Sequence, residues 1–189
     1  DKLIKSSACA HGFIYMQVTR GCAPRDHFFP TGVKPTFLIY ILDIGFPALK
    51  SNMKLTECII LPDERWMNCH IKSTNLLPNT LAIQKAKEAG AGEAILYRPD
   101  GTVTEGTRTN IFAVIDGAVR THPESPLILT GITRNVALDI LYKGNIAVSE
   151  VAFTIDDLNR ASEIWTTSTG LEISPVNKIE NYFSDIAAP

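Results

Sequence analysis

The sequence predicts a mixed α/β fold in two parts, with strands and helices alternating irregularly along its 189 residues. Short runs of β-branched and aromatic residues predict the strands, and apolar residues at helical spacing predict the helices. The segment GFPALKSN (45–52) interrupts this pattern and is typical of an interdomain linker. We therefore expect one part over residues 1–45, a linker over 46–52, and a second part over 53–189.

The first part is predicted to contain a helical piece and two strands. Residues 1–8 have a helix-like pattern, and residues 11–20 predict a strand that stops at Gly21. A loop at 22–34, rich in proline, glycine and charge, leads to residues 36–43, which are almost continuously apolar. Such a run predicts a strand that is buried on both faces.

The second part begins with a predicted strand at 53–61, which leads into a polar stretch that ends at Lys72. A helix is expected over 77–89, because Asn75 suits the cap, Pro78 the first turn and Gly90 the stop. The other predicted elements here are a short helix and six strands, at 155–160 and at 93–98, 110–115, 118–121, 147–153, 163–167 and 174–179.

A second long helix is expected over 131–142, where Gly144 ends it. Its apolar residues fall at helical spacing and predict one buried stripe, formed by Ile132, Val136, Ala137, Ile140 and Leu141. Asp116 and Gly117 stand between two strand-like runs and predict a hairpin turn.

The composition argues against several classes of function. The net charge of −2 leaves no basic footprint for nucleic acid or an anionic membrane, and no apolar run is long enough to span a bilayer. The four cysteines and four histidines lack the spacing of a zinc site or a disulfide framework, so we expect no metal site and a reducing, cytoplasmic compartment. Because the chain begins at Asp1 and ends at Pro189 just after a strand-like segment, we interpret it as a piece of a longer protein.

Lys72 is the first candidate for chemistry. It stands at the end of a short run with apolar residues and just before the helix at 77–89. A lysine that projects from the end of a strand into a partly buried cavity is suited to act as a nucleophile that forms a Schiff base. The alternative is a solvated lysine at a strand-to-helix turn.

Three further segments combine glycine with polar residues. TEGTRTNIF (104–112) places Glu105 and small polar residues ahead of an apolar strand, with an exposed acid in a turn as the alternative. LTGITR (129–134) opens a helix, whose free N–H groups and positive dipole end suit an anion; a simple cap is the alternative. WTTSTG (165–170) ends a strand in hydroxyls that suit either a phosphate cradle or a turn. A lysine, a separate acid and two phosphate-friendly turns are the parts of a pyridoxal phosphate site.

With these segments in this order, the chain resembles the class IV, fold-type IV pyridoxal phosphate enzymes. This family includes D-amino acid aminotransferases, branched-chain aminotransferases and aminodeoxychorismate lyases. The resemblance extends from about His11 to Val176 and rests on Glu105, Asn110, Phe112, Thr121 and the helix start at 131–134. It implies a small α/β domain, represented by its C-terminal part at 1–45, and a larger domain at 53–189 with a barrel-like mixed sheet and flanking helices. It also implies a homodimer.

The resemblance assigns roles residue by residue. Lys72 would be the Schiff-base lysine, and Glu105 would hold the pyridine nitrogen of pyridoxal 5′-phosphate. Ile132 and Thr133 would offer backbone N–H groups to the phosphate, and Thr169 would add a hydroxyl. Arg65 would be a positive residue near the site, without a defined role.

The loop at 23–30 discriminates within the family. Arg25 and His27 resemble the carboxylate trap of D-amino acid aminotransferases, and in an extended chain both would point the same way. A guanidinium can grip a carboxylate with two hydrogen bonds while the histidine adds another donor. On local grounds alone, both are surface residues of a loop.

The sequence departs from the family pattern in three places. His70 stands where the family usually has an acid; on a strand it would share a face with Lys72 and either touch the site or fill core. Arg108 replaces a small hydroxyl residue and would crowd the cofactor or pair with an acid. The part of the family that supplies a further phosphate-binding arginine and a substrate-binding tyrosine has no counterpart in this chain.

The function expected from this resemblance is transamination of D-amino acids of the D-alanine class with a 2-oxo acid acceptor. Within the family, the alternatives are a branched-chain L-aminotransferase and an aminodeoxychorismate lyase. An alternative of another class is a folded but catalytically silent fragment.

Overall fold

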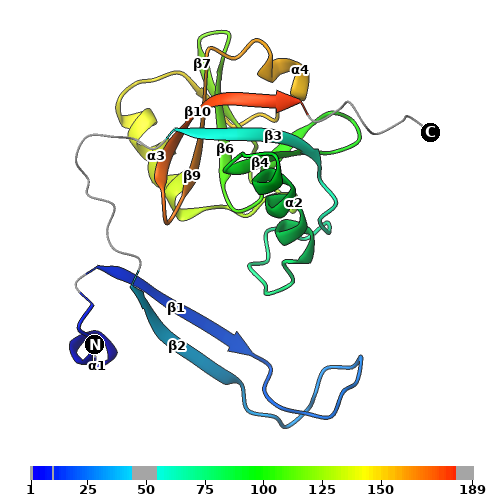
Figure 1. Ribbon diagram of the computed structural model, residues 1–189, viewed down its shortest axis with the longest axis vertical. Helices are drawn as coiled ribbons and strands as arrows, with labels where there is room; N and C mark the ends of the chain where they lie inside the picture. The colour runs from blue at the N-terminus through cyan, green and yellow to red at the C-terminus, as the bar shows by residue number, and fades with distance from the viewer. Residues whose placement is uncertain (1, 10, 44–54, 182–189) are drawn as a thin grey trace. The chain divides into compact units, whose positions relative to one another are not determined.

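The computed structural model describes residues 2–9, 11–43 and 55–181 and divides into two compact units, Asp1–Asn52 and Met53–Pro189 (Figure 1). The predicted linker at 46–52 lies outside the described residues. The assignment of 1–45 and 53–189 to a small and a large domain therefore stays a prediction.

The first unit contains helix α1 (Lys2–Ser6) and an antiparallel pair of strands, β1 (Gly12–Thr19) and β2 (Thr36–Asp43). Tyr15 and Tyr40 pack across the pair, with ring centroids 4.9 Å apart. The predicted elements are confirmed, but the prediction that β2 is buried on both faces is wrong for this unit. Most of its apolar side chains are exposed, because a two-stranded sheet offers no second layer to cover them.

The second unit is built on a mixed, eight-stranded sheet with the order β5-β4-β3-β10-β9-β6-β7-β8. Four strands separate β5 from β6 in this order, yet the short turn at 107–109 joins them along the chain, so the sheet must curl to bring them together. This arrangement confirms the predicted barrel-like mixed sheet. The strands are β3 (Thr56–Pro62), β4 (Glu93–Tyr97), β5 (Val103–Gly106), β6 (Asn110–Ile115), β7 (Ala118–Thr121), β8 (Val148–Ser149), β9 (Glu163–Ser168) and β10 (Glu172–Asn181).

The curled sheet surrounds one apolar core and carries a helix against each of two outer faces (Figure 1). Alternate side chains of a strand point to opposite faces, so Cys58 and Ile60 of β3 enter the inner core while Ile59 and Leu61 face helix α2 (Leu77–Glu88). Helix α3 (Ile132–Lys143) covers the outer face of β6 and β7 in the same way. The inner core consists of Cys58, Ile60, Ile95, Val103, Ile111, Ala113, Ile115, Phe153 and Leu158.

The helices begin and end close to their predicted limits. Pro78 lies in the first turn of α2, and Gly90 follows its last turn with a positive φ of 80°. Asn75, however, does not cap α2, because the N-cap is Leu76 and no side chain caps this end.

The predicted stripe of α3 is wrong in part. Val136 and Ile140 are 51 % and 62 % exposed, and Ile132 is also exposed, so this row of residues does not face the sheet. Ala137 and Leu141 of the predicted stripe, together with Leu138, pack on β6 and β7. Apolar spacing therefore predicted the helix and only part of the face that the sheet covers.

Several strands differ in extent from the prediction. Strand β8 spans Val148–Ser149 instead of 147–153, because the following chain turns away to pair with the segment before β5: Thr102 forms a bridge with Thr154. Strand β5 was not predicted, since Glu105 and Gly106 suggested a turn. Thr154 also opens the short helix α4 (Ile155–Leu158) with a reciprocal capping box to Asp157.

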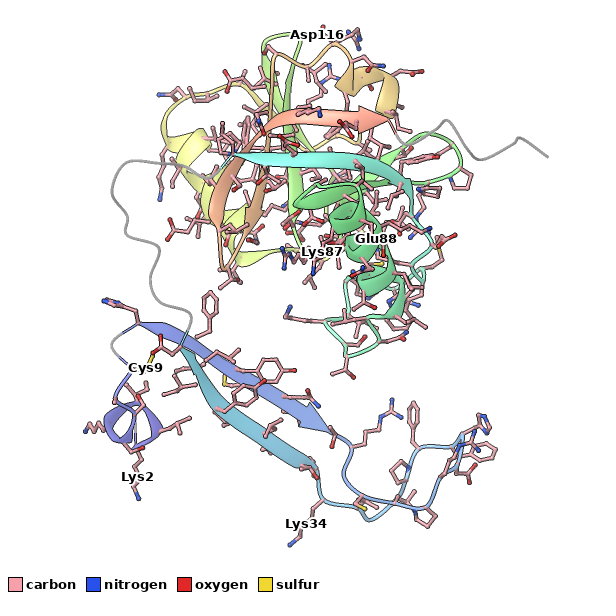
Figure 2. All side chains as sticks on the ribbon, viewed as in Figure 1. Lys2, Cys9, Lys34, Lys87, Glu88 and Asp116 are labelled. Atoms are coloured by element: carbon pink, nitrogen blue, oxygen red, sulfur yellow. The ribbon has the colours of Figure 1, made fainter. Side chains whose placement is uncertain are left out.

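The hairpin between β6 and β7 has the predicted turn. Asp116, labelled in Figure 2, and Gly117 both have positive φ angles, 52° and 80°, as a two-residue hairpin turn requires. At this exposed tip Asp116 forms ion pairs with Arg120 and Arg160. No helix in the described part of the chain is long and apolar enough to cross a bilayer.

Candidate active site

The candidate site centres on the carboxylate of Glu105, at the end of β5. Glu105 is 5 % exposed and accepts hydrogen bonds from three directions. The N–H of Leu129 lies 3.0 Å from Oε2, the Nδ2 of Asn110 also lies 3.0 Å from Oε2, and Nη1 of Arg65 forms an ion pair with Oε1. Glu105 is therefore a buried carboxylate with defined hydrogen-bond donors, and not the exposed turn residue that the local sequence favoured.

Arg65 links Glu105 to a second buried acid. Its Nη2 and Nε each lie 2.8 Å from an oxygen of Asp63, in a bidentate pair, and its Nη2 also donates to the carbonyl oxygen of Leu127. Thr104 donates to the same Asp63 carboxylate at 2.7 Å. The loop after β3 thus supplies a guanidinium that compensates two buried carboxylates.

Burial and charge act in opposite directions on these acids. Burial raises the pKa of Glu105 to about 7, although Arg65 and the N–H of Leu129 favour the ionised form. Burial also acts to raise the pKa of Asp63, but the hydrogen bonds and charge of Arg65 outweigh it and hold that pKa below its usual range. With this balance between burial and the charge of Arg65, Glu105 is an acid–base group that gains or loses a proton near neutral pH.

The start of α3 lies beside this carboxylate. Gly131 is the N-cap, and no side chain caps the helix, so its first N–H groups remain available for an anion. A Cβ at Gly131 would collide with Oδ1 of Asn110, the residue that also donates to Glu105. Thr167 stands opposite Asn110 in the sheet, and its Oγ1 is a buried atom without a partner among the described residues. These features fit a bound group with a polar ring atom and a phosphate.

We predict that Gly131→Ala weakens binding of phosphate-bearing ligands by about tenfold. The added methyl group would displace either Asn110 or the helix start, whereas the φ of −72° at Gly131 is itself accessible to alanine. Titration with pyridoxal 5′-phosphate, followed by protein fluorescence, measures the effect. Gly144→Ala, at the other end of α3, is the control. Equal affinity of Gly131→Ala and the unaltered chain would show that the helix start is not part of the site.

Lys72 lies in the loop between β3 and α2, not at the end of a strand as predicted. Strand β3 ends at Pro62, and the intervening chain forms bends and a turn in which the N–H of Ile71 donates to the carbonyl oxygen of Asn68. Lys72 is exposed, and no described residue forms a hydrogen bond or ion pair with its amine. The N–H of Cys69 donates to the carbonyl oxygen of Pro126 at 2.7 Å, which holds this loop against the segment before Leu129. The N–H of Leu129 in turn donates to Glu105.

The remaining predicted cofactor residues lie at element ends. Ile132 and Thr133 form the first turn of α3, where their N–H groups face the end of the helix. Thr169 is exposed in the turn between β9 and β10, two residues after Thr167. The structure brings the α3 start, Asn110 and Glu105 together, and within the described part of the chain no hydrogen bond or ion pair joins Lys72 or Thr169 to them.

Arg25 and His27 lie in the other unit, on the loop between β1 and β2, and both are exposed. The loop is bent here and not extended, because the Oδ1 of Asp26 accepts the N–H of His27 at 2.6 Å. The predicted shared direction of the two side chains therefore does not follow from strand geometry. Their role as a carboxylate trap stays a prediction.

Two departures from the family pattern can be placed. His70 lies in an exposed turn and not on a strand, so it shares no strand face with Lys72 and fills no core. Arg108 is exposed in the turn between β5 and β6, and it has no ion pair with any residue that the structure describes.

Sequence reasoning missed the specific role of Arg65 and the part played by Asn110 in the site's geometry. One signal was available: Arg65 follows Asp63 by two residues directly after a buried strand, a spacing that allows the carboxylate to accept both the backbone N–H and the guanidinium. No short motif could have shown that Glu105, forty residues later, meets the same guanidinium.

The chain is similar to known proteins along nearly its whole length. Residues 1–179 match the family model of the class IV amino-transferases. The D-alanine aminotransferase of Bacillus licheniformis is 42 % identical over 178 residues, which are 94 % of this chain and 62 % of the relative. The chain thus spans about 62 % of the length of this curated relative.

Solved structures show the same fold. The branched-chain aminotransferase of Thermoproteus uzoniensis, solved with norvaline, is 28 % identical with a TM-score of 0.74. The match covers 84 % of this chain and 54 % of the Thermoproteus chain. An aminotransferase from Brucella abortus, solved with its cofactor PLP bound, is 22 % identical with a TM-score of 0.69, covering 77 % of this chain and 52 % of its own. Since the family model covers nearly the whole chain, the chain belongs to the class IV aminotransferases, a family of enzymes that depend on pyridoxal phosphate.

Proposed function

We propose that the protein to which this chain belongs transfers the amino group of D-amino acids, of the D-alanine class, to a 2-oxo acid with the help of pyridoxal 5′-phosphate. The observation that carries the cofactor is the buried Glu105 carboxylate, held by Arg65 and Asn110 beside the uncapped start of α3. The substrate class is supported by the curated relatives, which are D-alanine aminotransferases at 42 % identity.

The cofactor supplies, when bound, an aromatic ring that withdraws electrons from the α-carbon of the substrate. Lys72 would hold the cofactor through its Nζ, and the neutral Nζ would serve as the general base for the α-proton of the substrate. Glu105 holds a proton at the ring nitrogen through a charged hydrogen bond, which the Asn110 amide and the Leu129 N–H orient. The N–H groups of Ile132 and Thr133, with the hydroxyl of Thr169, hold the phosphate.

A direct assay compares D-alanine, L-leucine and aminodeoxychorismate as substrates, each with 2-oxoglutarate present. D-alanine is expected to yield pyruvate and D-glutamate, and a two-step exchange mechanism predicts ping-pong kinetics. Preferred turnover of L-leucine would instead support a branched-chain aminotransferase, which the 28 % identity to the Thermoproteus uzoniensis enzyme favours as second candidate. Release of pyruvate from aminodeoxychorismate in a parallel reaction that lacks 2-oxoglutarate would support a lyase.

Arg25 and His27 are proposed to bind the substrate carboxylate. Arg25→Leu is expected to raise the KM for D-alanine by about 10- to 100-fold with a smaller change in kcat, because a charged bidentate contact is lost. Lys34→Leu, which removes another exposed cation of the same loop (Figure 2), is the control. An unchanged KM in Arg25→Leu would remove this residue from the substrate site.

A candidate of another class is a folded domain that is catalytically silent by itself. The observation in its favour is that the chain spans about 62 % of its curated relatives. Addition of pyridoxal 5′-phosphate distinguishes the two, since an active site develops a visible absorbance band that Lys72→Ala lacks. A chain without this lysine-dependent band would be silent, whatever the activity of a longer protein.

The family resemblance and the free cysteines also bear on the assembly and the location of the protein. We propose a homodimer by resemblance to the family, and the exposed apolar side chains of β1 and β2 support burial by a further surface. All four cysteines are free, which suits a reducing compartment and supports a cytoplasmic enzyme. Small amino acids and 2-oxo acids are the expected partners.

A further inference from the structure

A third buried acid, besides Glu105 and Asp63, contacts the turn that joins β5 to β6. Glu93, the first residue of β4, is 2 % exposed and accepts four hydrogen bonds. Two come from backbone N–H groups, of Ala94 and Thr107, both at 2.9 Å. The other two come from the hydroxyls of Thr107 and Thr109. An acid with this set of donors is fully satisfied and serves as a fixed anchor.

The anchored turn connects two residues of the candidate site. Glu105 immediately precedes Gly106, where the turn begins, and Asn110 immediately follows Thr109, where it ends. The N–H of Gly106 closes the turn on the carbonyl oxygen of Thr109 at 2.7 Å. The Nδ2 of Asn110 then reaches back to Glu105 at 3.0 Å. The separation of these two side chains therefore depends on the shape of a turn whose hydroxyls and N–H groups Glu93 holds.

Helix α2 is attached to the same turn. The Nδ2 of Asn79 donates to the carbonyl oxygen of Thr107 at 2.7 Å, so the turn is held from both sides. A Cβ at Gly106 would collide with Oγ1 of Thr109 and press on the Glu93 carboxyl group, which shows how closely the three groups are packed. Glycine is needed here for close approach and not for its backbone angle.

We propose that Glu93 is a positioning residue of the active site: it fixes the turn between β5 and β6 and thereby the geometry of Glu105 and Asn110. Glu93 does not touch the candidate site itself, since its hydrogen bonds all go to the turn and to Ala94. Its importance for catalysis rests on the proposed function, but its effect on Glu105 exists without a cofactor.

Amide hydrogen exchange of the chain without cofactor tests this effect. The N–H of Thr107 binds Glu93 directly, whereas the N–H of Leu129 binds only Glu105 and reports whether that carboxylate stays in place. In Glu93→Gln, which exchanges a charged acceptor for a neutral one, both amides should exchange at least about tenfold faster. Glu57→Gln changes an exposed acid on the neighbouring strand β3 in the same way and should leave both amides unchanged.

Faster exchange at Thr107 with normal exchange at Leu129 would overturn the proposal, because the turn would then loosen without moving Glu105. Normal exchange at both amides would overturn it too. If Glu93→Gln does not fold, Thr109→Val removes one hydroxyl donor from the same carboxylate and is judged by the same two amides.

Cofactor binding supplies the second measurement. Glu93→Gln should weaken affinity for pyridoxal 5′-phosphate about tenfold, but by less than about twofold when Glu105 is already glutamine, because residues that act through one another are not additive. Equal losses in both backgrounds would contradict the proposal. If the unaltered chain binds no pyridoxal 5′-phosphate, the proposed function fails, while the exchange of Leu129 still decides the role of Glu93.

Discussion

Lys72→Ala is expected to abolish transamination, lowering kcat by about 10³-fold or more, and to leave the folded structure unchanged. The proposed amine is both the covalent attachment of the cofactor and the base that moves the α-proton, and no neighbouring group can replace both roles. The structure makes the second half of this expectation specific. Lys72 is exposed and has no hydrogen bond or ion pair with any described residue, so its removal costs the fold little.

Two measurements separate catalysis from stability. The visible absorbance of the chain with pyridoxal 5′-phosphate should lose its lysine-dependent band in Lys72→Ala, while the thermal unfolding midpoint of the cofactor-free protein stays unchanged. Lys87→Ala, on the exposed surface of α2 (Figure 2), removes an equivalent charge and should keep the band. A band that persists in Lys72→Ala and vanishes in another lysine variant would assign the chemistry to that other lysine.

The sequence predicted the elements that local patterns specify. Strands β6 and β7 with their Asp116 turn, and both long helices, have their predicted positions because alternation, helical spacing and glycine stops are encoded by near neighbours. The family resemblance selected Glu105, although local sequence favoured an exposed turn there. Glu105 is a buried strand residue because β5 pairs with β4. No local sequence pattern encodes this pairing.

Features that depend on tertiary contacts were missed or wrong. Lys72 was predicted at a strand end because it follows a short run with apolar residues, but the Arg65 interactions and the Cys69–Pro126 hydrogen bond hold this segment as a loop. Val136 and Ile140 of α3 were predicted to be buried but are exposed, because apolar residues occupy nearly all sides of this helix. The buried network of Glu93 was not predicted, since an acid at the start of an apolar strand gives no sign of its partners.

Arg65→Met is expected to be the most destabilising single change at the site, by about 3–5 kcal/mol in the free energy of unfolding. Methionine fills a similar volume but leaves the carboxylates of Asp63 and Glu105 buried without the guanidinium that now compensates both. Chemical denaturation of the cofactor-free chain measures the loss. Arg160→Met is the control, because Arg160 forms ion pairs at the exposed tip near Asp116 and its removal should leave stability near that of the unaltered chain.

The pH dependence of this loss has a definite sign. Burial already raises the folded-state pKa of Glu105 to about 7, so the unaltered protein loses stability as the pH rises from the ordinary glutamate pKa to about 7. Without Arg65, Glu105 holds its proton still more tightly, and only Arg98 and the Thr104 hydroxyl still act to lower the pKa of Asp63. The deficit of Arg65→Met should therefore grow between pH 5 and pH 8, since Glu105 must then lose its proton without the guanidinium and Asp63 with only Arg98 and Thr104 beside it. A deficit that shrinks over this range would mean that Arg65 stabilises the fold by packing and not by compensating charge.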